Sequence, residues 1–238
     1  GSNSSGQLGR GVVNNLSIVP PGTVANIDNA ISIVAGQTHF CALLSDRTVS
    51  CWGDNSWGQI GDGTRVSRSV PTTVPGLIDV MKLTAKGDHT CAIDRVGRLR
   101  CWGKASAGQL GDGRVSTNSN PSLVNRTSDS TSLAGGDEQV CTVTNDNLVR
   151  CWGGNSNGQL GDGSRSPSNI PVQVGGVVRS DFGGPPIFMA HEDATCSATT
   201  FSGSDQVACW GRYADGLSTQ SRAIASPLSD AFSGVSRL

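Results

Sequence analysis

Short runs of apolar residues alternating with polar ones fill this chain, and Gly- and Ser-rich turns separate them. In the first complete set, the pattern predicts β-strands over residues 30–35, 38–44, 48–53 and 69–74. Helical periodicity does not extend over any useful length. The outer strand follows a proline, which is tolerated at a sheet edge and disfavoured at its centre. The pattern therefore predicts an all-β fold of short antiparallel strands.

The same pattern returns every 50 residues. The triplet Cys-Trp-Gly begins at Cys51, Cys101 and Cys151, and a polar loop such as Asn55-Ser-Trp-Gly-Gln-Ile-Gly-Asp-Gly63 follows it each time. A fourth, stretched copy contains Cys196 and Cys209. Self-similarity at a fixed period predicts stacked identical units. Four short antiparallel strands per unit predict the blades of a small β-propeller.

The eight cysteines form four pairs at similar spacing: Cys41 with Cys51, Cys91 with Cys101, Cys141 with Cys151, and Cys196 with Cys209. A hairpin that turns at Asp46 places the first pair face to face on antiparallel strands, about 4.5–5.5 Å apart, which suits a disulfide. The Cys-x-x-Cys spacing that zinc and redox sites favour does not occur. We therefore predict one disulfide per blade. Because disulfides persist in oxidising compartments, we expect a secreted, periplasmic or cell-surface location.

These motifs together resemble a known repeat. The order Gly-x-x-His-x-Cys-Ala-Leu, Cys-Trp-Gly and Asn-Ser-x-Gly-Gln-Leu-Gly-Asp-Gly is similar to the repeat of the regulator of chromosome condensation family. It is more similar still to the cysteine-containing version in secreted bacterial proteins and some plant receptor ectodomains. The resemblance covers nearly all of residues 3–229 and implies a propeller, which well-known members close with seven blades. It does not imply one function, because propellers host unrelated activities.

We predict a single propeller domain over residues 1–238, with repeats at roughly 3–53, 54–103, 104–153 and 154–211 and a partial one at 212–238. The chain starts inside a unit, because residues 3–9 read as the polar loop without its Cys-Trp-Gly, and residues 16–19 then read as an outer strand. In one interpretation this strand completes the last blade and closes a small ring. In the other, the chain is a fragment, or a subunit whose ring or stack another chain completes.

Charge and motifs exclude several classes of function. Lys and Arg number 18 against 19 Asp and Glu, so the basic surplus typical of nucleic-acid binding is missing. No run of 18 apolar residues exists that would insert into a membrane. Neither a Gly-x-Ser-x-Gly elbow, a phosphate-binding loop nor a His-Glu-x-x-His motif occurs. We therefore expect no enzymatic activity, no cofactor and no metal.

Several recurring polar and aromatic residues are better explained as scaffold. His39 and His89 occupy equivalent positions, with Gln139 in the third copy, so they are spread around the ring and are expected to form hydrogen bonds rather than bind a metal. The Gly-Asp-Gly segments are typical of turns, and one carboxylate per loop is too few for calcium. The tryptophans that follow a cysteine are expected to pack between blades: Trp52, Trp102, Trp152 and Trp210.

Candidate binding residues lie where the copies differ. Trp57 stands where later copies have Ala107 and Asn157, so the scaffold does not require an indole there. An exposed aromatic residue on a loop is a candidate binding anchor, and an isolated surface aromatic is the alternative.

The fourth unit departs most from the pattern. Pro171 and Cys196 are 25 residues apart, against 20 for the corresponding residues of the two preceding units. Insertions in repeat proteins often lie on the functional face, although a degenerate terminal repeat would look the same. The predicted ligand-binding residues are therefore Trp57, Arg179, Asp181, Phe182, His191, Glu192, Asp193 and Tyr213.

These observations favour a non-enzymatic extracellular recognition or adhesion module, part of a larger surface or fibre protein. It would bind an extracellular protein or glycan through one propeller face and its variable loops. The alternatives are a secreted proteinaceous enzyme inhibitor, a receptor ectodomain and, with least support, a nucleotide-exchange factor like the family's namesake. The expected partners exclude nucleic acid and direct membrane insertion. A homo-oligomer that completes the ring or a fibre remains open.

Overall fold

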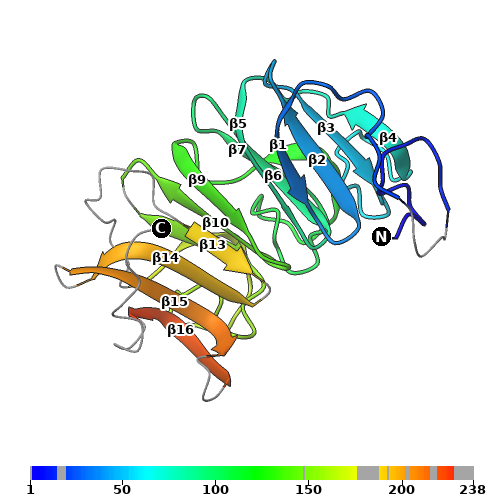
Figure 1. Ribbon diagram of the computed structural model, residues 1–238. Helices are drawn as coiled ribbons and strands as arrows, with labels where there is room; N and C mark the ends of the chain where they lie inside the picture. The colour runs from blue at the N-terminus through cyan, green and yellow to red at the C-terminus, as the bar shows by residue number, and fades with distance from the viewer. Residues whose placement is uncertain are drawn as a thin grey trace.

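The computed structural model describes residues 2–14, 20–146, 148–175, 188–191, 193–201, 204–214 and 219–227. These residues form four antiparallel sheets of four strands, each in chain order from the inner to the outer strand (Figure 1). No helix in the described part of the chain is long and apolar enough to cross a membrane.

Blade 1 consists of β1 (Ala30–Ala35), β2 (His39–Leu44), β3 (Val49–Gly53) and β4 (Arg68–Thr73). Blade 2 consists of β5 (Val80–Lys86), β6 (His89–Asp94), β7 (Leu99–Gly103) and β8 (Asn118–Leu123). Blade 3 consists of β9 (Ser130–Gly135), β10 (Gln139–Thr144), β11 (Val149–Gly153) and β12 (Ser168–Gln173). Blade 4 consists of β13 (Phe188–His191), β14 (Ala194–Phe201), β15 (Ser204–Ala214) and β16 (Thr219–Pro227). The strands predicted for the first blade are confirmed to within one residue.

One disulfide joins the second and third strands of every blade, as predicted. Cys41 lies directly opposite Cys51 in the β2–β3 ladder, with their Cα atoms 4.0 Å apart. The other three pairs repeat this register with Cα separations of 4.1 Å, and no cysteine is free. The register of the second and third strands therefore places the two cysteines of each pair opposite each other, close enough to form the disulfide.

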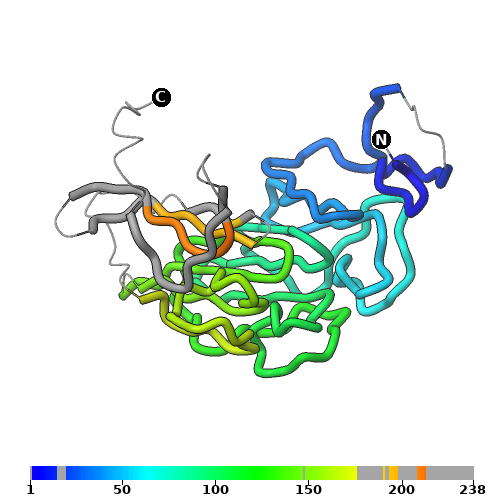
Figure 2. The backbone as a smooth tube through the Cα atoms, turned by 90° about the horizontal axis from the view of Figure 1, so that it is seen from below, coloured from blue at the N-terminus to red at the C-terminus, as the bar shows by residue number. Residues whose placement is uncertain are grey.

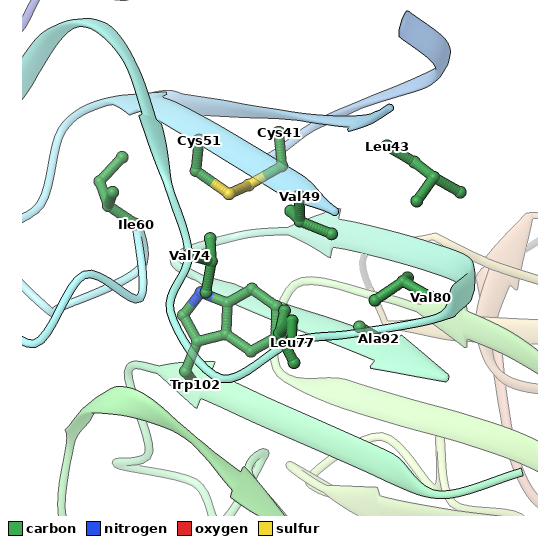
Figure 3. Close-up of a cluster of buried hydrophobic side chains, with 10 residues drawn as sticks. All are labelled: Cys41, Leu43, Val49, Cys51, Ile60, Val74, Leu77, Val80, Ala92 and Trp102. Atoms are coloured by element: carbon green, nitrogen blue, oxygen red, sulfur yellow. A yellow bond between two sulfur atoms is a disulfide. The ribbon is translucent and has the colours of Figure 1, made fainter. Parts of the chain in front are cut away.

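The hydrophobic core is divided into clusters that lie between consecutive blades. Figure 3 shows the first cluster, in which Cys41, Val49 and Cys51 of blade 1 face Val80 and Trp102 of blade 2. Two similar clusters join blade 2 to blade 3 and blade 3 to blade 4. Each sheet is therefore stabilised mainly by its neighbours, as expected for stacked repeats.

Each tryptophan that follows a cysteine makes the same hydrogen bond, and this bond fixes each blade to the loop before it. The indole Nε1 of Trp102, which is fully buried, donates a hydrogen bond to the backbone oxygen of Gln59 in the preceding loop, at 2.9 Å. Trp52, Trp152 and Trp210 make the same bond to Gln7, Gln109 and Gln159, at 2.9–3.0 Å. Packing of the tryptophans between blades is thereby confirmed.

The four blades form an arc with blade 1 and blade 4 at its two ends (Figures 1 and 2). Contacts between inner strands run from β1 to β5, from β5 to β9 and from β9 to β13. The self-closed small ring is therefore not the arrangement that the described residues adopt. The outer strand expected at residues 16–19 lies outside the described residues.

Candidate binding face

The polar loops that follow the third strands are folded by their own side chains. Asn55 accepts a hydrogen bond from the Ile60 backbone N–H at 2.9 Å, and Gln59 accepts one from the Trp57 N–H at 2.9 Å. Both side chains are completely buried. Because these bonds use backbone donors at positions 57 and 60, the loop keeps its shape whatever side chain position 57 carries.

The same glutamine bond recurs in the other loops. It is donated by the backbone N–H of Ser5, Ala107 and Asn157 to the glutamine two residues later, at 2.8–2.9 Å. The chain therefore displays four loops of one conformation whose tips differ: Ser5, Trp57, Ala107 and Asn157. This arrangement presents variable side chains on a rigid support.

The Gly-Asp-Gly turn closes the first complete loop. Asp62 accepts hydrogen bonds from Thr64 Oγ1 and from Arg68 Nε, each at 2.7 Å. Burial opposes ionisation of this carboxyl, but the bonds from Thr64 and Arg68 outweigh it and hold the pKa of Asp62 below its ordinary value. Asp62 thus stabilises a turn, as its sequence context predicted.

Trp57 projects from its tip with 41% of its surface exposed. The Lys104 ammonium lies 5.6 Å from the centre of the indole ring, within the range of a cation–π interaction. The same ammonium lies 3.9 Å from Asp88 Oδ2. Residues from blades 1 and 2 thus meet around one exposed aromatic ring.

Carboxylates surround this group. Burial raises the pKa of Asp88; the positive charge of Lys104 opposes that shift, and the negative charges of Asp54 and Asp137 add to it. Asp137 in turn lies 3.8 Å from the ammonium of Lys86. The face around Trp57 therefore combines an aromatic ring with closely spaced charges of both signs.

Of the predicted ligand-binding residues, Trp57 and Asp193 are described with their side chains. Asp193 precedes β14 and accepts a hydrogen bond from Gln159 Nε2 at 3.2 Å. Its backbone oxygen accepts the Arg212 N–H, just as the Asp88 oxygen accepts the Lys104 N–H. Asp193 therefore occupies in blade 4 the place of Asp88 in blade 2, on the same face of the propeller.

The remaining predicted residues are not brought together by the described structure. His191 and Tyr213 are placed in β13 and β15 by backbone only. Arg179, Asp181, Phe182 and Glu192 lie outside the described residues. Their role in binding stays a prediction.

Sequence reasoning missed Lys104 and Asp88, and a signal for both was present. Position 104 is Asp54 in the first copy and Gly154 in the third, and position 88 is Thr38 in the first copy. The comparison of copies that selected Trp57 would have selected these residues as well.

Of the two histidines expected to form hydrogen bonds, His39 has a hydrogen-bond partner, as predicted, whereas the buried Nδ1 and Nε2 of His89 have none among the described residues, so the prediction is wrong for His89. His39 is fully buried, and its Nε2 lies 2.8 Å from Thr90 Oγ1 of blade 2. Burial lowers the pKa of His39 to about 4 and that of His89 to about 3. Within the described residues no three potential metal ligands lie close enough to hold an ion.

Four-stranded antiparallel blades stacked around an arc, with rigid loops on one face, define a β-propeller-type repeat protein. Two family models, each described as a regulator of chromosome condensation (RCC1) repeat, match this chain. One matches residues 30–59 and 82–109, and the other matches residues 48–93 and 146–183. The matched residues are therefore RCC1 repeats, and the disulfides of the blades fit a version of this repeat that carries cysteines.

Solved propellers show the same fold. Human WBSCR16 superposes with a TM-score of 0.80 at 21% identity, covering 96% of this chain and 61% of that one. Prp20p from Saccharomyces cerevisiae superposes with a TM-score of 0.74 at 21% identity, covering 97% of this chain and 59% of that one. The chain thus spans about three fifths of the length of these structures.

Proposed function

We propose that this protein is a non-enzymatic extracellular recognition module that binds a protein partner through the face bearing the variable loop tips, with Trp57 as the anchor. The observation that carries the proposal is the exposure of Trp57 at the tip of a loop whose fold does not need it. Tryptophan is among the residues most enriched at energetic hot spots of protein interfaces. A large aromatic side chain held by a rigid loop also loses little conformational entropy on binding.

The charges around Trp57 support a protein partner. Lys104 lies over the ring, Asp88 pairs with its ammonium, and the charge of Asp54 acts on Asp88. Charges of both signs favour a partner of complementary pattern and fix its orientation. The Lys104 ammonium lies over the ring, 5.6 Å from its centre, and its side chain is 29% exposed, so groups of a partner can reach both. A sugar ring stacked on Trp57 is the competing arrangement.

Two further observations fit this function. Four disulfides favour an oxidising, extracellular environment. The propeller of yeast Prp20p has been described together with its binding to Gsp1p and histones, which are proteins. An adhesion role within a larger surface protein belongs to the same proposal.

The proposal is tested with an array of extracellular protein domains and a glycan array, both probed with the fluorescent, disulfide-intact chain. Trp57→Ala is the test variant, because Ala107 occupies the same position in a loop that makes the same glutamine hydrogen bond. Asn157→Ala is the matched control at another tip. We expect specific binding to a protein that weakens at least about tenfold in Trp57→Ala and is unchanged in the control.

Two results would reject this assignment. One is a protein ligand that binds the Trp57→Ala variant as tightly as the original chain. The other is binding confined to the glycan array, which would make the module a carbohydrate reader.

A further inference from the structure

Lys104 stands at a position where the first loop has a carboxylate. There Asp54 Oδ2 accepts a hydrogen bond from Gln59 Nε2 at 2.8 Å. The second loop has Lys104 at this position, and the buried Nε2 of Gln109 has no hydrogen-bond partner among the described residues. A buried donor without an acceptor destabilises the folded chain. The folding of its own loop therefore does not explain Lys104.

The Lys104 ammonium instead reaches the tip of the neighbouring loop. It lies 5.6 Å from the centre of the Trp57 ring and 3.9 Å from Asp88 Oδ2. Blade 1 has Thr38 in the place of Asp88, so the fold does not require a carboxylate there. An aromatic ring beside a carboxylate is an arrangement that binds cations. Trp57 and Asp88 thus form a site for a positively charged group, and the chain's own ammonium occupies it.

The charges around this site favour a cation over an anion. Burial raises the pKa of Asp88; the positive charge of Lys104 opposes that shift, and the negative charges of Asp54 and Asp137 add to it. The other lysine near these carboxylates, Lys86, lies 3.8 Å from Asp137 Oδ1. If Lys104 moved away without a replacement, Asp88 would be left with two like charges acting on it. A group that displaces the Lys104 ammonium must therefore bring a positive charge of its own.

From these contacts we infer that the partner of the Trp57 face presents an arginine side chain, which displaces the Lys104 ammonium, stacks on the indole and pairs with Asp88. A planar guanidinium stacks on aromatic rings and forms two parallel hydrogen bonds with a carboxylate, whereas an ammonium is a strongly hydrated point charge. Lys104 then acts as an internal competitor, which neutralises the site in the free chain and yields only to a cation that binds more strongly. The inference rests on the proposed function, because it names the group that the Trp57 face binds.

The test uses the isotope-labelled, disulfide-intact chain and a blocked Gly-Arg-Gly tripeptide as the probe, followed by NMR. The control peptides are blocked Gly-Glu-Gly and blocked Gly-citrulline-Gly, which keeps the shape of arginine without its charge. The readout is the indole N–H signal of Trp57, identified by its loss in Trp57→Ala. The other indoles serve as internal references, because they are buried and bonded to backbone oxygens: Trp52, Trp102, Trp152 and Trp210. We expect the arginine peptide to shift the Trp57 signal saturably and the control peptides to leave it in place.

Two substitutions at the site should change binding of the arginine peptide in opposite directions. Lys104→Gln removes the competing ammonium and should tighten binding at least about threefold. Asp88→Asn removes the paired carboxylate and should weaken binding at least about threefold. Lys82→Gln, which removes a lysine from the inner strand β5, is the matched control and should bind like the original chain. If the reference indole signals show that Asp88→Asn disturbs folding, Asp88→Thr introduces the residue of blade 1 and should weaken binding equally.

The inference is overturned if the arginine peptide leaves the Trp57 signal unchanged, if a control peptide shifts it as strongly, or if Lys104→Gln weakens binding of the arginine peptide. These outcomes are separate from a failure of the proposed function. A protein ligand on the array that requires Trp57 and is unaffected by Asp88→Asn would keep the recognition module and reject the arginine site. Binding of the arginine peptide as expected, with no arrayed protein that depends on Trp57, would keep the cation site and reject the proposed function.

Discussion

Acidification should destabilise the folded chain before most of its carboxylates titrate, because two histidines are buried in their neutral form. Burial lowers the pKa of His39 to about 4, with the negative charge of Asp54 opposing the shift. Burial lowers the pKa of His89 to about 3, and the positive charges of His39 and Lys104 add to that shift. In the unfolded chain both groups have the ordinary value of 6.5.

The direction of the pH dependence of stability follows from these pKa values. Between pH 6.5 and about 4 the unfolded chain binds protons on both histidines that the folded chain cannot bind. The stability that the neutral histidines contribute is therefore complete above pH 6.5 and is lost as the pH falls. From pH 7.5 to pH 4.5 each histidine should cost roughly 2–3 kcal/mol of unfolding free energy, against a typical total of about 5–15 kcal/mol.

The assay is denaturant unfolding under non-reducing conditions at pH 7.5 and 4.5, followed by tryptophan fluorescence. The decisive variant is the double substitution His39→Gln with His89→Gln, because Gln139 occupies the same position in blade 3 and lies under an equivalent glycine, Gly136. The original chain should lose roughly 5 kcal/mol between the two pH values, and the variant only a small part of that. An equal loss in both chains would show that other groups control acid stability and would refute the reasoning.

Two further tests, a pair of glycine variants and the removal of one disulfide, probe the scaffold. Gly61→Ala should destabilise the chain by more than about 3 kcal/mol, because the new Cβ would lie 2.6 Å from Trp102 Nε1 at a φ of +82°. Gly76→Ala should cost only about 1 kcal/mol, because no atom lies within 4 Å of its Cβ and only the positive φ is unfavourable. Thermal unfolding compares the two variants. Replacing Cys91 and Cys101 together with Ala should lower the unfolding free energy by about 2–3 kcal/mol, measured by chemical denaturation, because a loop closed over a separation of 10 residues is released. Equal midpoints for the two glycine variants, or no change without the disulfide, would contradict these expectations.

The sequence predicted the blades well because the relevant signals are local. Strand limits, hairpin register and disulfide pairing depend on residues about ten apart, such as Cys41 and Cys51, and the repeat shows the same pattern several times. The hydrogen bond of each tryptophan could not be predicted, since its acceptor is a backbone oxygen about 45 residues earlier in the chain. That contact exists only when blades are stacked.

The candidate face was predicted in part, for a related reason. Trp57 was found because it differs from its counterparts, and that comparison needs no structure. Its meeting with Lys104 and Asp88 depends on how blade 1 places its loop on blade 2, which sequence spacing alone does not give. Ring closure was left open because it depends on the curvature of the stack, a property of the interblade contacts rather than of any one repeat.

The repeat also explains why binding and folding can change independently in this chain. Buried Asn55 and Gln59 hold the loop by accepting hydrogen bonds from backbone N–H groups, so the side chain at position 57 has no structural role. Ser, Trp, Ala and Asn all occur at that position in loops of the same conformation. Exchanging Trp57 for Ala should therefore alter stability by no more than about 0.5 kcal/mol while it removes the anchor. A large loss of stability in that variant would mean that the indole and Lys104 hold blades 1 and 2 together, and that the exposed ring belongs to the scaffold instead of to a binding site.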